Sequence, residues 1–167
     1  MKKMIVIMLT MVLALVVSAC SGDKSSTTDD KTTAVEPSAS AKEMIEQMVT
    51  QIEQPALIEL TAEDLLNLYG IDATTLEDFS VRIPMMNVKS NEIAIFKVKD
   101  EKDIAEVLTA VEQRAEDVMK TFEQYLPDQY ENAKNHKIVT KGNYVLFVIS
   151  DQADKLIAVY DRFFVKK

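Results

Sequence analysis

The chain of 167 residues contains one cysteine, one histidine, three glycines and no tryptophan. Because Cys20 is the only thiol and His136 the only imidazole, a metal site built from clustered Cys and His, such as a catalytic zinc site, is excluded. Three scattered glycines form no phosphate-binding loop. The absence of tryptophan removes a sugar-stacking platform and argues against a glycosidase. We therefore expect neither a cofactor nor an enzymatic activity.

Serine hydrolase chemistry needs a serine, a base and an orienting acid within reach of one another. The expected folded part contains only Ser80, Ser90 and Ser150, and none of them lies in a Gly-x-Ser-x-Gly turn. The sequence therefore does not support this class either, although an enzyme of unrecognised type stays open as a third alternative.

The N-terminus combines the features of a bacterial export signal. Lys2 and Lys3 provide a positive start, and residues 4–17 form an apolar run that only Thr10 interrupts. This run is shorter than the roughly 20 apolar residues that a membrane-spanning helix needs, but its length is typical of a cleaved signal peptide. We predict a signal peptide over residues 1–19.

Val17, Ser18, Ala19 and Cys20 end this segment and resemble a bacterial lipobox. The resemblance implies that diacylglycerol is attached to the Cys20 thiol and that the signal peptide is cut immediately before it. The alternative is an ordinary signal peptide cleaved near Ala19, which would leave an unpaired thiol in an exported chain. Two acyl chains would anchor the protein stably at the outer face of the cell membrane.

Residues 20–41 consist mainly of Ser, Thr, Asp, Lys and Ala, with almost no bulky apolar side chain. Such a segment cannot bury enough surface to offset its ordering entropy. We therefore predict a lipidated cysteine followed by a disordered tether, and one folded domain over residues 42–167.

Acidic residues dominate the charge. Loss of Lys2 and Lys3 with the signal peptide leaves 17 basic against 27 acidic residues, a net charge near −10. A phosphate backbone is bound through clustered Lys and Arg, so nucleic acid is excluded as a partner.

Two helices are expected at the start of the folded domain. Apolar residues recur at helical spacing over residues 41–54, and Pro55 ends that pattern. Thr61 and Asp64 then form a capping box. The short helix that they begin ends at Gly70, which is suited to a left-handed cap.

The remainder predicts two hairpins, each followed by an amphipathic helix. The strands are expected at residues 79–83, 92–98, 136–140 and 144–150, and the helices begin after Asp100 and Asp151, the first of them ending or bending at Pro127. We therefore predict an α+β fold with a four-stranded antiparallel sheet in the order ββαββα. The helices would cover one face, and the N-terminal helices part of the other. Residues 95–100 and 146–151 align loosely, which suggests a duplicated ββα unit.

Five residues are candidates for a binding surface: Tyr69, Arg82, Met85, Met86 and Glu92. Methionines can form an adaptable surface for a partner, although at helical spacing, as at Met44 and Met48, they more commonly fill a core. Arg82 and Glu92 are expected to face each other across the first hairpin, as a structural cross-strand pair or as part of a pocket. His136 is expected at a surface or sheet edge.

Several segments resemble a family of small lipoproteins from clostridia-like Gram-positive bacteria that carry a domain of unknown function. They are Leu68 to Asp72, Val81 to Pro84, Asn91 to Val98 and Tyr144 to Ser150. The resemblance covers roughly residues 60–164. It implies an extracytoplasmic location and a single domain, and it implies no substrate and no active site.

These observations predict a non-enzymatic lipoprotein at the outer face of the membrane, whose domain binds an envelope protein or a wall component. The alternative is a lipoprotein that captures a small ligand in a pocket between the sheet and the N-terminal helices. That alternative requires a cavity of several hundred cubic ångströms with converging polar groups.

Overall fold

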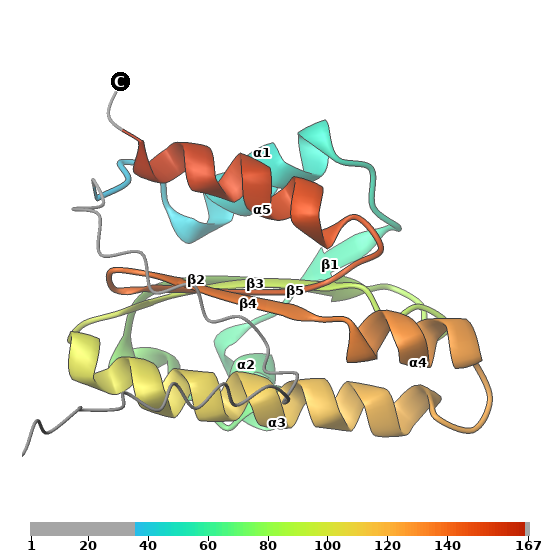
Figure 1. Ribbon diagram of the computed structural model, residues 1–167. Helices are drawn as coiled ribbons and strands as arrows, with labels where there is room; N and C mark the ends of the chain where they lie inside the picture. Colours follow the sequence, from blue (N-terminus) through green and yellow to red (C-terminus); the bar gives the residue numbers. More distant parts are fainter. Residues whose placement is uncertain (1–35, 166–167) are drawn as a thin grey trace, which may run out of the picture.

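An open antiparallel sheet of five strands separates two layers of helices in the computed structural model, which describes residues 36–165 (Figure 1). The strands are β1 (Leu57–Glu59), β2 (Leu76–Pro84), β3 (Glu92–Val98), β4 (Lys137–Lys141) and β5 (Tyr144–Ile149), in the spatial order β1-β2-β3-β5-β4. The helices are α1 (Ala41–Gln51), α2 (Ala62–Tyr69), α3 (Ile104–Phe122), α4 (Pro127–Lys134) and α5 (Ala153–Asp161). Short 3-10 turns add Ala73–Thr75, Glu101–Asp103 and Arg162–Phe164.

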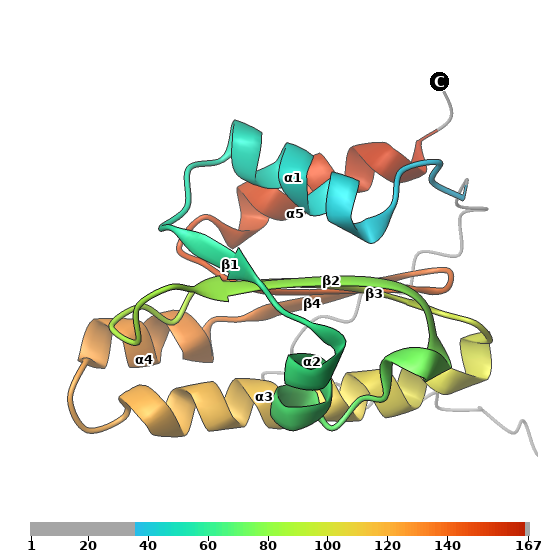
Figure 2. The same ribbon diagram turned by 180° about the vertical axis from the view of Figure 1, so that it is seen from behind.

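The structure confirms a mixed fold of helices with an antiparallel sheet, but three details of the prediction are wrong. The sheet has five strands and not four, because β1 pairs with the end of β2 through Ile58 and Ile83. The order ββαββα also fails, because β1 precedes the first hairpin and α4 follows α3. The predicted division of the helices is wrong as well, because α1 and α5 lie on one face of the sheet and α2, α3 and α4 on the other (Figures 1 and 2).

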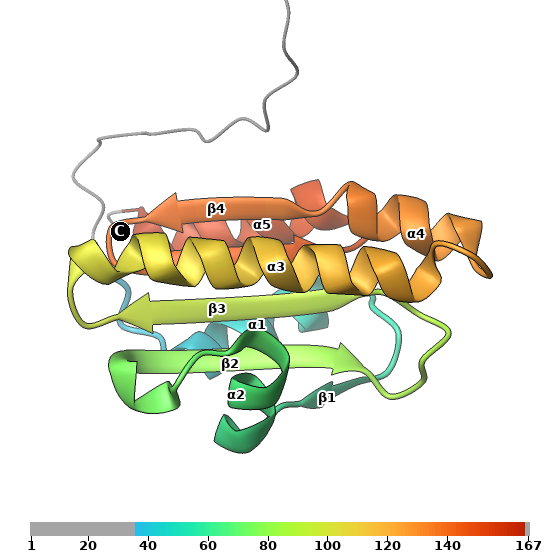
Figure 3. The same ribbon diagram turned by 90° about the horizontal axis from the view of Figure 1, so that it is seen from below.

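Strands β3 and β5 pair with each other at the centre of the sheet, and helices cover both of their faces. All six residues of β5 are buried, which explains why its sequence is apolar without alternation. One core lies between the sheet and α3, which runs along the strands in Figure 3. The other core lies beneath α1 and α5 and contains Met44 and Met48, both fully buried.

Local signals in the sequence set the ends of α2. The Thr61 hydroxyl accepts a hydrogen bond from the Asp64 amide, and the Asp64 carboxylate accepts one from the Thr61 amide, so the predicted capping box is confirmed. Gly70 follows α2 with φ = 68°, in the left-handed region that glycine favours.

The helix that follows β3 begins differently from the prediction. Asp100 caps the 3-10 turn Glu101–Asp103, and α3 starts only after that turn. Asp151 does not cap α5, since Gln152 occupies the N-cap position. Pro127 neither ends nor bends α3, which already ends at Phe122; it is the first residue of α4.

Contacts with the domain begin before residue 42. Ser40 caps α1 by accepting a hydrogen bond from the Glu43 amide, and the Ala41 amide donates to Oδ2 of Asp78 over 2.7 Å. Glu36 pairs with Lys97 at the end of β3. The predicted signal peptide, the lipobox and the greater part of the predicted tether lie outside the described residues.

Candidate functional site

Tyr69 and Glu92, two of the candidate residues, meet in a buried polar network that Arg114 completes. The Tyr69 hydroxyl donates to Oε1 of Glu92 over 2.5 Å, and the Glu92 side chain is only 2% exposed. Nε and Nη2 of Arg114 donate to the same carboxylate over 3.0 and 2.8 Å. The Arg114 guanidinium also lies 5.7 Å from the centre of the Tyr69 ring. The network therefore joins α2, β3 and α3.

The electrostatics of this network keep Tyr69 protonated and Arg114 charged. Burial raises the pKa of Tyr69 well above its usual value, and the Glu92 carboxylate raises it further. Burial would lower the pKa of Arg114, but the charge of Glu92 and the hydrogen bonds to it outweigh that effect and raise it. Every charged group of the network has a partner inside it, so this arrangement supports packing of α2 and α3 on the sheet.

Sequence reasoning missed Arg114, although a signal for it exists. Arg114 interrupts the apolar stripe of α3 between Val111 and Val118, and a charge at such a position needs a buried partner.

The predicted pair between Arg82 and Glu92 does not form. In the ladder of β2 and β3, Arg82 lies opposite Ile93, so Glu92 points to the other face of the sheet. Arg82 instead reaches α1, where Nη2 lies 3.2 Å from Oε1 of Glu46. The two candidates therefore belong to different layers and do not form one site.

Met85 and Met86 lie on the loop between β2 and β3, at one end of the sheet. Both are 65% exposed, and Val88 on the same loop is 45% exposed. Tyr125, which is 53% exposed, approaches from the turn between α3 and α4, and its hydroxyl donates to the Asn87 carbonyl oxygen over 3.3 Å. We call Met85, Met86, Val88 and Tyr125 the apolar end surface.

Hydrogen bonds to α4 hold the loop that carries this surface. The buried Ser90 amide donates to Oε1 of Gln129 over 2.9 Å, and Nδ2 of Asn132 donates to the Ser90 hydroxyl over 3.0 Å. The ring of Phe122, which is part of the core, lies 5.8 Å from that of Tyr125. Two segments distant in sequence, each with exposed apolar side chains, are thus joined at this end of the sheet. The sequence alone gave no indication of Val88 or Tyr125.

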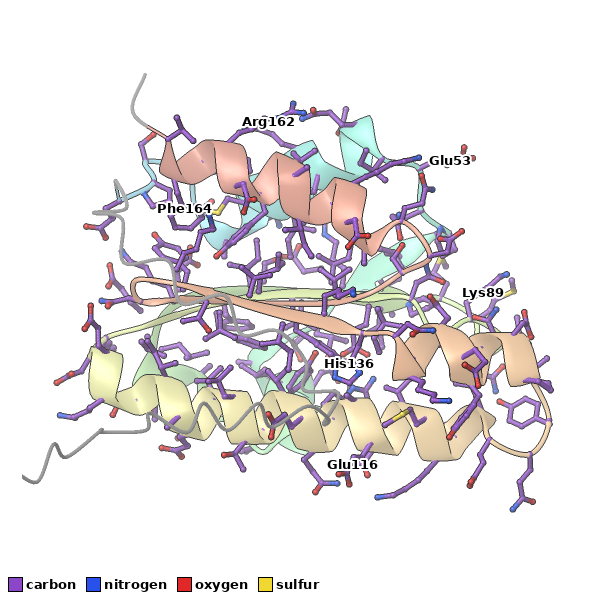
Figure 4. The ribbon with its side chains drawn as sticks, in the orientation of Figure 1. Glu53, Lys89, Glu116, His136, Arg162 and Phe164 are labelled. Carbon is purple, nitrogen blue, oxygen red and sulfur yellow. The ribbon has the colours of Figure 1, made fainter. Side chains whose placement is uncertain are left out.

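The opposite end of the sheet is polar and holds the first described residues. Lys97, whose side chain is 12% exposed, lies 2.6 Å from carboxylate oxygens of both Glu36 and Glu77. Hydrogen bonds to Glu36 and Glu77 raise the pKa of Lys97. We call this region, Glu36, Glu77 and Lys97, the tether end. Figure 4 labels Phe164 close to it and Lys89, on the β2–β3 loop, at the opposite end of the domain.

A pocket of about 180 Å³ adjoins the tether end. Its lining residues are Glu36, Pro37, Lys141, Gly142, Asn143, Tyr144 and Phe164. Small-molecule sites usually enclose roughly 300–1,000 Å³. This pocket is smaller, and it lies beside the β4–β5 turn and not between the sheet and the N-terminal helices, where the ligand-binding alternative places one.

His136 is half-buried below the sheet (Figure 4). Its Nδ1 donates to the Ala133 carbonyl oxygen over 2.9 Å, and its ring lies edge-on to Phe147. Among residues 36–165, no three His, Cys, Asp or Glu side chains gather in a way that could hold a metal ion. None of the helices in this range is long and apolar enough to cross a membrane.

Together, fold and site define a small domain whose antiparallel sheet is covered by helices on both faces and which exposes apolar side chains at one end. Residues 50–150 match the family described as Domain of unknown function (DUF4358). The match spans more than half of the chain, and the protein belongs to this family. The predicted resemblance to a family with a domain of unknown function is confirmed to that extent. No curated protein and no solved structure matches the chain.

The matched range covers the sheet and one of the two helical layers. It includes the buried network and the apolar end surface, whereas α5 and nearly all of α1 lie outside it. The layer formed by α1 and α5 therefore lies almost entirely outside the matched range, although it closes the second core.

Proposed function

We propose that this protein is an exported lipoprotein, anchored through Cys20 to the outer face of the cell membrane, and that its domain binds a protein partner. Val17 to Cys20 after an apolar run of signal-peptide length support export and anchoring. Binding, and not catalysis, is supported by the types of residue present. The buried Glu92 carboxylate, for example, is paired with Arg114.

The apolar end surface is the observation that carries the binding proposal. Single exposed apolar side chains are common on protein surfaces. Here, four of them come from two loops that the hydrogen bond from Tyr125 to Asn87 joins, so they lie at the same end of the sheet. Methionine side chains adapt to the shape of an apolar partner, and tyrosine is enriched at interfaces. This combination is typical of a contact surface.

Metabolic labelling with a palmitate analogue tests the anchor. We expect the parent chain to be labelled and to fractionate with membranes, and the Cys20→Ala variant to lose the label. Ser25→Ala, a matched change outside the predicted lipobox, should behave as the parent. Equal labelling of the parent and the Cys20→Ala variant would contradict the proposal.

Affinity enrichment from envelope extracts tests binding. The domain should retain a partner that neither a charge-matched unrelated protein nor the Met85→Asp/Met86→Asp variant retains. If the variant enriches the same proteins as the parent domain, the apolar end surface is not the contact.

A further inference from the structure

The methionines of the described residues differ sharply in their access to solvent. Met85 and Met86, on the β2–β3 loop, are each 65% exposed. Met119 on α3 is half-buried and packs against the core on the α3 side. Met44 and Met48 are fully buried in the core beneath α1 and α5. A small reagent in solution therefore reaches the first two thioethers while the fold excludes it from the last two.

The β2–β3 loop is held by contacts that do not use the sulfur atoms of its two methionines. The Met85 amide donates to the Ala56 carbonyl oxygen over 3.0 Å, and the Met86 carbonyl oxygen accepts a hydrogen bond from the Lys89 amide. Ser90 joins the end of the loop to α4. Neither methionine is part of the two cores of the described domain. A chemical change confined to these sulfur atoms would therefore leave the fold in place.

Methionine is the side chain of the described domain that mild two-electron oxidants attack most readily. Cys20, the only cysteine of the chain, lies outside the described residues, and the chain has no tryptophan. A peroxide transfers one oxygen atom to the thioether: the O–O bond breaks, an S–O bond forms, the sulfur loses two electrons, and hydrogen peroxide is reduced to water. The product is a sulfoxide, which is polar where the thioether was apolar.

We propose that Met85 and Met86 form a reversible oxidation site, at which a peroxide converts two of the four side chains of the apolar end surface into sulfoxides. In the reverse step, two thiols of a reductase system are oxidised to a disulfide, the thioether is restored, and the oxygen leaves as water. The inference goes beyond the proposed function and does not need it. Neither acylation of Cys20 nor a bound partner is required for a peroxide to reach the two sulfur atoms.

Peptide mass spectrometry tests the selectivity of the oxidation. Trypsin places the exposed, half-buried and buried methionines on three separate peptides, residues 83–89, 115–120 and 43–82. The full-length protein, purified in detergent, is exposed to hydrogen peroxide for increasing times and then digested. We expect peptide 83–89 to gain two oxygen atoms at least about tenfold faster than peptide 43–82, because a buried thioether reacts only when the structure around it opens. In concentrated urea, which removes the burial, the rates should converge.

The stability of the fold and the reverse step are checked on the same samples. Protein that is oxidised only on peptide 83–89 should keep the circular dichroism melting curve of the untreated protein. Two methionine sulfoxide reductases, one for each epimer, supplied with a dithiol should remove both oxygen atoms from the folded protein. Met85→Leu/Met86→Leu, which conserves volume, should abolish the rapid oxidation. Met119→Leu, a matched change at the half-buried position, should leave the oxidation of peptide 83–89 unaltered.

Three results would overturn the inference. They are equal oxidation rates of the three peptides in the native protein, a lowered melting temperature after oxidation of peptide 83–89 alone, and sulfoxides that the reductases do not remove from the folded protein. The palmitate label separates the inference from the proposed function. An unlabelled Cys20 with selective oxidation of peptide 83–89 refutes the anchor and leaves the oxidation site in place, whereas a labelled Cys20 with unselective oxidation does the reverse.

Discussion

Arg114 of α3 and Glu92 of β3 form a two-pronged ion pair in the interior, with Nη2 of the arginine 2.8 Å from Oε2 of the glutamate. The pair links the longest helix to a central strand, and the Tyr69 hydroxyl occupies the remaining side of the carboxylate. Each of these two buried charges stabilises the other, because either one alone would be removed from water without an opposite charge to compensate it.

Removal of Arg114 should therefore be costly. We expect Arg114→Met to lower the free energy of unfolding by about 3–5 kcal/mol, because Glu92 would stay buried without its counterion. Urea denaturation measures the change. The double variant Arg114→Met/Glu92→Gln should be less destabilised than Arg114→Met alone, since a neutral amide can still accept the Tyr69 hydrogen bond. Lys120→Met, on an exposed pair, should change stability by less than about 0.5 kcal/mol. A similar loss for Arg114→Met and Lys120→Met would refute this account of the network.

Gly70 should resist replacement for a reason confined to its backbone. A Cβ atom placed there meets no other atom within 4 Å, but φ is +68°. We expect Gly70→Ala to cost about 1–2 kcal/mol in thermal unfolding, the usual penalty for an L-residue in this conformation. Gly70→Asn should cost less, because asparagine tolerates the left-handed region. Equal losses for the two variants would point to a steric cause instead.

The methionines should separate into two groups by their effect on stability. Met85→Asp/Met86→Asp should change the free energy of unfolding by no more than about 0.5 kcal/mol, because both side chains are largely exposed. Met48→Ala, in the core beneath α1 and α5, should cost about 2–5 kcal/mol. Melting curves followed by circular dichroism give both values. Marked destabilisation by the double aspartate variant would mean that the loop packs more tightly than its exposure indicates.

Acid should weaken the domain through its helix caps. Hydrogen bonds from the Ser40 amide and hydroxyl lower the pKa of Glu43, and those from the Thr61 hydroxyl and amide lower the pKa of Asp64. A carboxyl whose pKa is lower in the folded state contributes stability above its ordinary pKa, near 4, and this contribution disappears as the pH falls through the folded-state value.

Thermal unfolding at a series of pH values from 7 to about 2.5 checks this expectation. The Glu43→Gln/Asp64→Asn variant should lose less stability than the parent between pH 5 and about 2.5, because it lacks two of the groups that must be protonated. Parallel curves for the parent and the variant would show that the caps are not responsible for the loss.

Features set by neighbours in sequence could be predicted, and features set by the sheet register could not. Thr61, Asp64 and Gly70 act within one or two turns of α2, so their spacing alone was informative. The register that places Arg82 opposite Ile93 depends on the length and shape of the loop between β2 and β3. A hydrogen bond from the Ser90 amide to Gln129 joins this loop to α4. One residue of difference in register moves Glu92 to the opposite face.

The elements that sequence analysis missed are short or lack an apolar pattern. Strand β1 has three residues, too few to show alternation. Helix α4 buries only Gln129 and Ala133, so its helical periodicity is weak, and Pro127 at its first position was the one available sign of a helix start. Of the apolar end surface, the sequence analysis found only Met85 and Met86. It missed Tyr125 because that residue reaches the surface from the turn before α4, a helix that was not predicted.

The packing of α1 against α5 has a consequence for how the molecule folds. These helices begin and end the domain, yet they lie side by side over β3 and β5 and share one core (Figures 1 and 2). Contacts between residues so distant in sequence form slowly, because the loop that joins them must close first. That core cannot assemble until synthesis has passed Tyr160, whereas every residue of the core on the α3 side precedes Ser150, so the layer of α1 and α5 is the last part of the domain that can close.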